Sequence, residues 1–89
     1  GTGAGTSVTN SNTISIGNGS QARGSSSIAI GTGNIVTGNN SGAIGDPNVI
    51  SGNESYALGN NNTIAQDNTF VVGNDVTTTQ ANSVVLGND

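Results

Sequence analysis

The sequence predicts an all-β protein, a parallel β-solenoid of 14-residue repeats, on three observations. Glycine recurs every fourteen residues along the chain. An apolar or small triplet precedes nearly all of these glycines, and the residues between are mostly the Asn, Ser, Thr and Gly of tight turns. A fixed period of this kind is typical of architectures in which each repeat forms one coil of a stack. All 89 residues therefore form one predicted domain of six coils.

The recurring glycine marks the end of the first strand in each repeat. It occupies Gly3 and then six more positions at the same spacing. The predicted turn glycines are Gly17, Gly31, Gly45, Gly59, Gly73 and Gly87. A second glycine follows half a period later in three repeats, at Gly24, Gly38 and Gly52. Each repeat therefore has two turns and room for two short strands.

The first strand of each repeat carries large apolar residues at alternate positions. One column stands directly before the glycine and the other stands two residues earlier. Because alternate side chains share a face of a strand, we expect both columns to fill the core. The predicted core residues are Ile14, Ile16, Ile28, Ile30, Ile44, Tyr56, Leu58, Phe70, Val72, Val84 and Leu86. Gly42 interrupts the earlier column and predicts a thin spot in the core.

Between these columns runs a third, which is small and apolar after Ser15 in the first coil. Its members are Ala29, Ala43, Ala57, Val71 and Val85. Alanine is neutral on an exposed face, which is one interpretation. We favour a second, in which small side chains let the backbones of several chains approach a symmetry axis, so this column is the candidate interface between chains. Strands buried on both faces do read as continuous apolar runs. Which apolar column faces such an axis stays open.

A second strand is indicated by one further apolar position, five residues after each glycine. The position holds Val8, Ala22, Val36, Ile50 and Ile64, and then Thr78. The run Thr77–Thr79 breaks this pattern and predicts that the regular coil ends there.

Composition excludes most chemistries. The chain has one Lys+Arg, five Asp+Glu, no His and no Cys, with a net charge of −4. Zinc ligation by nitrogen or sulfur, a thiol nucleophile and an imidazole base are therefore excluded. The basic surface that nucleic acids and anionic membranes require is missing as well. We expect no enzymatic activity, no metal or cofactor and no nucleic-acid partner. No apolar run reaches 18 residues, so we expect this segment not to insert into a membrane.

Three local motifs are better explained by the repeat. The run from Gly1 to Gly5 lacks the lysine of a phosphate-binding loop, and its glycines fall in the repeat frame. Gly73-Asn74-Asp75 lacks the nine-residue spacing of calcium-binding β-rolls. The acidic residues are spread over four columns of the repeat, and we expect them to be solvated surface groups with no catalytic role; they are Asp46, Glu54, Asp67, Asp75 and Asp89.

The repeat unit N-S-x-A-I-G resembles the YadA-like head repeats of trimeric autotransporter adhesins. It stands as Ser26–Gly31 and as Asn82–Gly87, and related units recur across the whole chain. The resemblance implies a left-handed parallel β-roll that assembles as a homotrimer. It further implies that Ile28 and Ile30 fill the core, that Ala29 is the small middle residue and that Gly31 makes the turn.

What the resemblance implies for function is adhesion. Such heads are virulence-associated and mediate attachment to host extracellular matrix, host cells or other bacteria. They are displayed at the cell surface and anchored in the outer membrane of Gram-negative bacteria through neck, stalk and anchor regions, which we expect outside these 89 residues.

Two other functions stay open. The chain could be a structural spacer that projects another adhesive domain, and sequence does not separate a spacer from an adhesin. A β-solenoid can also bind ice through flat ladders of threonine. Here Thr is mixed with Ser, Asn and Gln in its columns, which disfavours ice binding. The ligand and its contact residues are not indicated.

Overall fold

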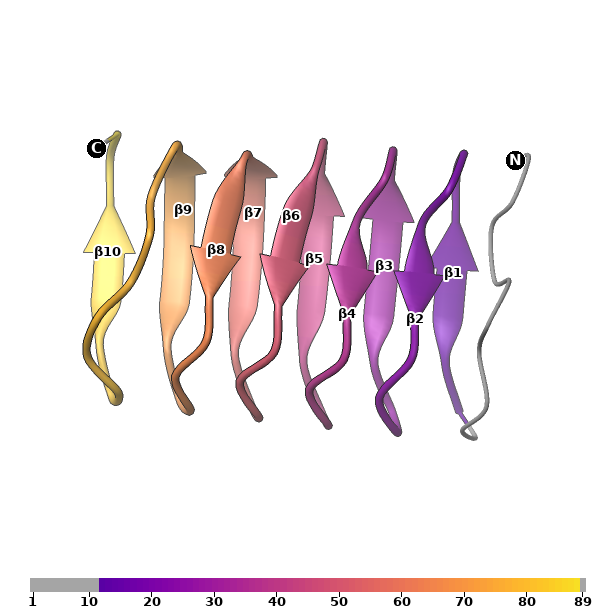
Figure 1. Ribbon diagram of the computed structural model, residues 1–89, viewed down its shortest axis with the longest axis horizontal. Coiled ribbons are helices and arrows are strands. Elements are labelled where there is room, and N and C mark those ends of the chain that lie inside the picture. Colours follow the sequence, from indigo (N-terminus) through magenta and orange to yellow (C-terminus); the bar gives the residue numbers. More distant parts are fainter. Residues whose placement is uncertain (1–11, 89) are drawn as a thin grey trace.

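The computed structural model describes residues 12–88, which form a two-layered stack of coils (Figure 1). Every strand pairing is parallel, so the predicted all-β solenoid is confirmed. The strands are β1 (Ile14–Ile16), β2 (Gln21–Ala22), β3 (Ile28–Gly31), β4 (Ile35–Val36), β5 (Gly42–Gly45), β6 (Asn48–Ile50), β7 (Tyr56–Asn60), β8 (Asn62–Ile64), β9 (Phe70–Asn74) and β10 (Val84–Leu86).

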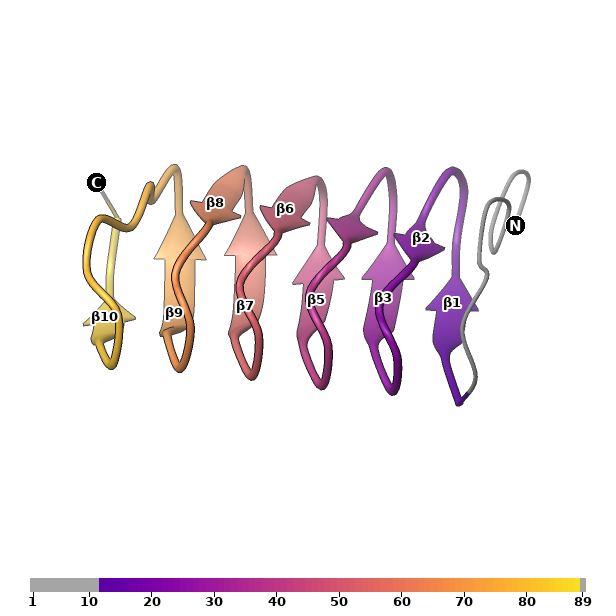
Figure 2. The same ribbon diagram turned by 60° about the horizontal axis from the view of Figure 1, so that its bottom comes forward.

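From β1 to β9, successive strands alternate between two sheets, so that each of these coils gives one strand to each sheet. The six-stranded sheet has the order β1-β3-β5-β7-β9-β10, and the four-stranded sheet has the order β2-β4-β6-β8. Each residue pairs with the residue fourteen positions later, as in Ala29↔Ala43 and Ala43↔Ala57, which is the period of the sequence. Figure 2 shows the coils as a row of narrow loops. The extents are 30 × 20 × 13 Å, so the shortest dimension leaves room for only a thin interior between the sheets.

The predicted turn glycines lie where the six-stranded sheet ends and the chain turns. Gly59 is representative, with a φ of 141°. A Cβ on Gly59 would lie 1.8 Å from the carbonyl oxygen of Gly73 in the next coil, a distance at which no side chain fits. Stacked coils bring backbone against backbone at this corner, and only glycine permits it. Positive φ also occurs at Gly17, Gly31, Gly45 and Gly87.

The core between the sheets consists of the small middle column and the apolar column of the second strand. Ala29 and Ala43 are fully buried, and from the opposite sheet so are Val36 and Ile50. The members of this core are Ala22, Ala29, Val36, Ala43, Ile50, Ala57, Ile64, Val71 and Val76, with Val85 partly buried against it.

The prediction that the two large apolar columns fill the core is therefore wrong. Ile14, Ile16, Ile44, Tyr56, Leu58, Phe70, Val72, Val84 and Leu86 are exposed on the outside of the six-stranded sheet, and Ile28 and Ile30 are half-buried there. Side chains alternate between the faces of a strand, so burying Ala29 turns both of its neighbours outward. The 13 Å coil holds small side chains from the six-stranded sheet, and the large ones lie outside it.

A ladder of buried asparagines fills one end of each coil. Asn48 has no exposed surface, and its Nδ2 donates to the carbonyl oxygen of Gly59 at 2.8 Å. Its Oδ1 accepts from the backbone N–H of Asn62 at 3.0 Å, and its own backbone N–H donates to Oδ1 of Asn34 at 2.8 Å. Each amide therefore pairs with the coils before and after it, which satisfies buried backbone groups at the corner.

The opposite end of the coil holds a ladder of buried hydroxyls. Ser41 Oγ donates toward the carbonyl oxygen of Gly52 at 2.8 Å and accepts from the backbone N–H of Ser55 at 3.1 Å. Ser55 Oγ in turn accepts from the backbone N–H of Thr69 at 3.1 Å. Both ends of the coil interior are thus polar but hydrogen-bonded, and only its middle is apolar.

Outside this second corner an exposed ladder links the same coils. Asn53 Oδ1 accepts from the backbone N–H of Asn39 at 2.9 Å, and Asp67 Oδ1 accepts from the backbone N–H of Asn53 at 2.9 Å.

We expect Asn53→Ala to lower the free energy of unfolding by only about 1 kcal/mol, because water replaces the lost acceptor at an exposed site. Urea unfolding measures this change. Asn53→Asp keeps the acceptor, as Asp67 already does, and should unfold at nearly the parent's midpoint in high salt; an equal loss in both variants would contradict the role of the bond.

The regular pattern ends in the last coil, as the run Thr77–Thr79 predicts. The four-stranded sheet stops at β8, and only an isolated bridge joins Thr63 to Thr77. Thr78 still points inward, with 8% of its surface exposed, and its hydroxyl donates to Oε1 of Gln66. The positions named above at Gly1 to Gly5, Val8 and Asp89 lie outside the described residues.

Candidate functional site

The main unexplained surface is the outside of the six-stranded sheet, which we call the outer apolar face. Two parallel ridges of side chains make it up, one from each large apolar column. The first ridge is Ile14, Ile28, Gly42, Tyr56, Phe70 and Val84. The second ridge is Ile16, Ile30, Ile44, Leu58, Val72 and Leu86. Because the strands pair in register, each ridge runs straight along the stack.

The outer apolar face is large enough to hold a partner. Nine of its side chains expose between 37% and 75% of their surface. At about 200 Å² for a fully exposed large side chain, they present on the order of 900 Å² of apolar surface. Apolar patches on monomeric proteins rarely exceed a few hundred Å², whereas each partner in a standard interface buries about 800 Å². The face therefore has the area of one side of a protein–protein interface.

Charge is missing from this face. Its positions on β1, β3, β5, β7, β9 and β10 are apolar or glycine throughout. The described acidic residues lie beyond the strand ends instead: Asp46 follows β5 and Glu54 precedes β7. Depletion of charge is the compositional mark of an interface centre.

Between the ridges lies an apolar groove with a volume of about 260 Å³. Its floor is the backbone at Ala43, Ala57 and Val71, and its walls are side chains of both ridges, including Tyr56 and Leu58. A groove of this kind accepts side chains from another surface, as ridges pack into grooves elsewhere in proteins.

The first ridge contains an ordered aromatic pair. The rings of Tyr56 and Phe70 stack with centroids 5.5 Å apart and an interplanar angle of 16°. A Cβ on Gly42 would lie 2.8 Å from a carbon of the Tyr56 ring, so the ring covers the bare backbone of Gly42. The thin spot predicted in the core at Gly42 is therefore on the outer face, and Tyr56 fills it.

The residues predicted to lie between chains do not reach the surface. Ala29, Ala43, Ala57 and Val71 are 0%, 0%, 3% and 1% exposed. The prediction that this small column forms the interface is wrong, because these side chains are the core of the coil. Val85, in the last coil, is half-buried and packs against the same core. The larger Val71 and Val85 thus add volume inside the coil.

A signal for this arrangement was present in the sequence. The first ridge varies from glycine to phenylalanine, a range of size that a 13 Å coil cannot hold. The middle column holds nothing larger than valine, and it shares its face with small hydroxyl residues such as Ser27 and Ser41. Uniform small size indicates a confined space, and variable size indicates a free surface.

The outside of the four-stranded sheet is different in character. Its outward column reads Gln21, Ile35, Val49 and Thr63, and the bridge at Thr77 continues it. Threonine occupies only the last two of these positions. Ice-binding faces need a regular threonine ladder, so the column does not favour that function.

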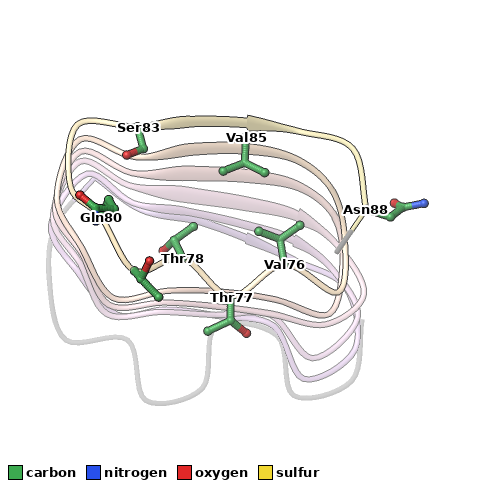
Figure 3. A pocket seen from close by; sticks show the side chains of 8 residues that line it. Val76, Thr77, Thr78, Gln80, Ser83, Val85 and Asn88 are labelled. Carbon is green, nitrogen blue, oxygen red and sulfur yellow. The ribbon is translucent and has the colours of Figure 1, made fainter.

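The last described coil borders a cavity of about 350 Å³, and Val76, Thr78 and Val85 point into it (Figure 3). Thr77 points away from the interior. The cavity is the cross-section of the coil itself, lined by the residues that a further coil would cover.

Other chemistry is sparse in the described part of the chain. Residues 12–88 bring no three acidic residues together at a spacing that could hold a metal ion. Asp67 and Asp75 instead accept hydrogen bonds within their own corner ladders, from Asn53 and Asn61. In the same range no helix has the length and apolarity needed to cross a membrane. The chain matches no protein-family model and no curated protein sequence.

Proposed function

We propose that the chain is the adhesive head segment of a trimeric surface protein, in which three left-handed β-rolls pack side by side through the outer apolar face. The observation that carries the proposal is that face, with nine exposed large apolar side chains and no charge. The number three, the handedness and the surface location come from the resemblance of the repeat to YadA-like heads. The face supports the assembly because its area is that of an interface.

Adhesion follows from what the assembly leaves outside. With the outer apolar face covered, the remaining surface is the four-stranded sheet and the two polar corners, repeated at the spacing of the coils. Such a surface offers many weak polar contacts to an extended polymer, and copies joined in one assembly bind with avidity. We expect the ligand to be a component of host matrix or of a cell surface.

Replacing Leu58 with aspartate tests the assembly. Leu58 is 52% exposed in the single chain, so a charge there has no reason to unfold an isolated coil stack. In the middle of an apolar interface the same charge loses its water without gaining a partner. We expect Leu58→Asp to weaken association at least 100-fold and to give a β-rich monomer, measured by sedimentation equilibrium and far-UV circular dichroism.

Thr63→Asp is the matched control. Thr63 is exposed in the middle of β8, on the opposite side of the molecule. The control should keep the parent's mass and circular dichroism. If Leu58→Asp assembles as the parent does, the outer apolar face is not the assembly surface and the proposal fails.

The adhesive role is tested separately, with the assembled parent and the monomeric Leu58→Asp chain on the same surfaces. Immobilised matrix proteins and host cells should retain the assembled protein, and the monomer should be retained at least tenfold less because avidity is lost. Assembly without any retention would reject the adhesive role and favour the spacer.

A further inference from the structure

A face made of repeated rungs does not by itself specify how copies align along the stack. The second ridge places Ile16, Ile30 and Ile44 in successive coils about 4.8 Å apart. A neighbouring copy displaced by one coil would meet nearly the same side chains along this ridge and would lose only the contacts of one coil. Uniform strand faces are prone to such slippage.

The first ridge breaks this uniformity. From β3 to β9 it changes from Ile28 to Gly42, then to Tyr56 and Phe70. No other stretch of either ridge changes so sharply in size between adjacent coils. We call Gly42, Tyr56 and Phe70 the aromatic step.

The aromatic step is held in one conformation by its own members. The ring of Tyr56 lies against the backbone of Gly42, where a Cβ would meet two ring carbons at 2.8 and 2.9 Å. Its other side stacks on Phe70 at a centroid distance of 5.5 Å. Tyr56 and Phe70 still expose 37% and 46% of their surface. Exposed rings fixed in this way are the pre-organised anchors that dominate protein interfaces.

The groove of about 260 Å³ lies beside the step. The side chains of Tyr56 and Phe70 form part of one wall, and Ile44, Leu58 and Val72 form the other. A partner surface has to fill this groove. Only when the copies are aligned in register does the groove of every copy meet the same side chains of its neighbour.

We propose that the aromatic step sets the axial register between copies of this chain, an inference that rests on the assembly proposed above. In a cyclic assembly, equivalent residues lie at the same height along the axis, so the steps of all copies meet one another. A copy displaced by one coil sets its Tyr56 ring against Gly42 of its neighbour and its Val84 against the neighbour's Phe70 ring, and it leaves the groove incompletely filled. The step thus acts against slipped assemblies, as single distinctive residues do in other repetitive interfaces.

Disulfide cross-linking between copies measures the register. The sequence contains no cysteine, so only the introduced cysteines can form disulfides. Ile16→Cys and Ile30→Cys lie one coil apart on the second ridge, away from the step. Two differently tagged chains, one with each substitution, are refolded together and oxidised. A like pair is a disulfide between the same position of two copies, 16 with 16 or 30 with 30, and an unlike pair joins position 16 of one copy to position 30 of another. When the copies are in register the positions of a like pair lie closer together, and after a slip of one coil the positions of an unlike pair do. Disulfides tolerate Cα separations of only about 4.4–6.8 Å, so the method resolves the difference.

With the native step we expect like pairs to exceed unlike pairs at least tenfold. The levelled variant removes the step by combining Gly42→Ile, Tyr56→Ile and Phe70→Ile. It keeps the face apolar, so it should associate and stay β-rich, while unlike pairs rise to within twofold of like pairs. A second variant, Tyr56→Ile with Phe70→Ile, leaves Gly42 unchanged, so the test does not depend on whether the triple variant folds. Its ratio of like to unlike pairs should be at least threefold lower than that of the parent.

The matched control changes the second ridge at the same coils without removing the step. It combines Ile44→Leu, Leu58→Ile and Val72→Ile, and its ratio should equal the parent's. If both step variants keep the parent's ratio, register is set elsewhere and the inference is overturned. If the parent associates but gives like and unlike pairs equally, the inference fails while the assembly stands. If the parent is monomeric, the assembly proposal itself fails, and the inference fails with it.

Discussion

Ala43→Arg is expected to abolish folding of the chain. Ala43 is fully buried between the two sheets of a coil stack whose shortest extent is 13 Å. An arginine there overfills the interior and buries a charge without a partner, each of which costs several kcal/mol. The total exceeds the lower part of the 5 to about 15 kcal/mol that stabilises a typical domain. Loss of the β signal in far-UV circular dichroism measures the effect.

Thr63→Arg is the comparison for this substitution. It places the same side chain in the middle of β8, where Thr63 is exposed, and should leave the circular dichroism and the urea midpoint nearly unchanged. If Ala43 lay in an interface between chains, as the sequence predicted, Ala43→Arg would instead give a folded chain that no longer associates. That result would return Ala43 to an interface between chains and contradict the core found here.

The period, the corners and the two strands of each coil could be predicted from the sequence because local chemistry determines them. A glycine such as Gly59 is required where backbones stack too closely for a Cβ, and that requirement repeats in every coil. The parallel register then follows from the period. Each of these features depends on residue type and spacing, which the sequence displays.

The direction in which each column faces was harder to predict. Alternation places Ala29 opposite Ile28 and Ile30, but both sets are apolar, so hydrophobicity does not decide which is inside. Size decides it, because a narrow coil admits alanine and excludes the range from Gly42 to Phe70. The predicted core residues therefore lie on the outer apolar face, and the predicted interface residues lie in the core. The outer face of the six-stranded sheet, which is available to partners, carries larger apolar side chains than the inner face.

The buried asparagines were missed for a different reason. Asn34, Asn48 and Asn62 recur three residues after the turn glycine, but asparagine is usually exposed. In the fold their side-chain amides hydrogen-bond to backbone carbonyl and N–H groups that are shielded from water at the corner. Asn48 does so with the carbonyl of Gly59 and the N–H of Asn62. This need arises only once coils stack, so it belongs to the tertiary structure and not to the local sequence.

Asn48→Leu is the second substitution with a large expected effect. Leucine keeps the branched shape of asparagine but removes three hydrogen bonds. The buried backbone N–H of Asn62 loses its acceptor, the Gly59 carbonyl keeps only the longer bond from the Asp46 N–H at 3.3 Å, and the Asn34 side-chain oxygen keeps only the backbone N–H of residue 48. At about 1 to 3 kcal/mol for the buried unsatisfied N–H and about 1 kcal/mol for each of the other two lost bonds, we expect the free energy of unfolding to fall by about 3 kcal/mol or more. Urea unfolding at fixed protein concentration measures it.

Asn60→Leu separates the buried ladder from asparagine in general. Asn60 Oδ1 also accepts a backbone N–H from the neighbouring coil, that of Asp46 at 3.0 Å, but the site is exposed. Water replaces this acceptor, so the same substitution should cost about 1 kcal/mol or less. If Asn48→Leu and Asn60→Leu cost the same, burial adds nothing to the ladder. The unequal costs expected here would instead mean that each coil depends on the next coil for partners of the buried groups that it cannot satisfy alone.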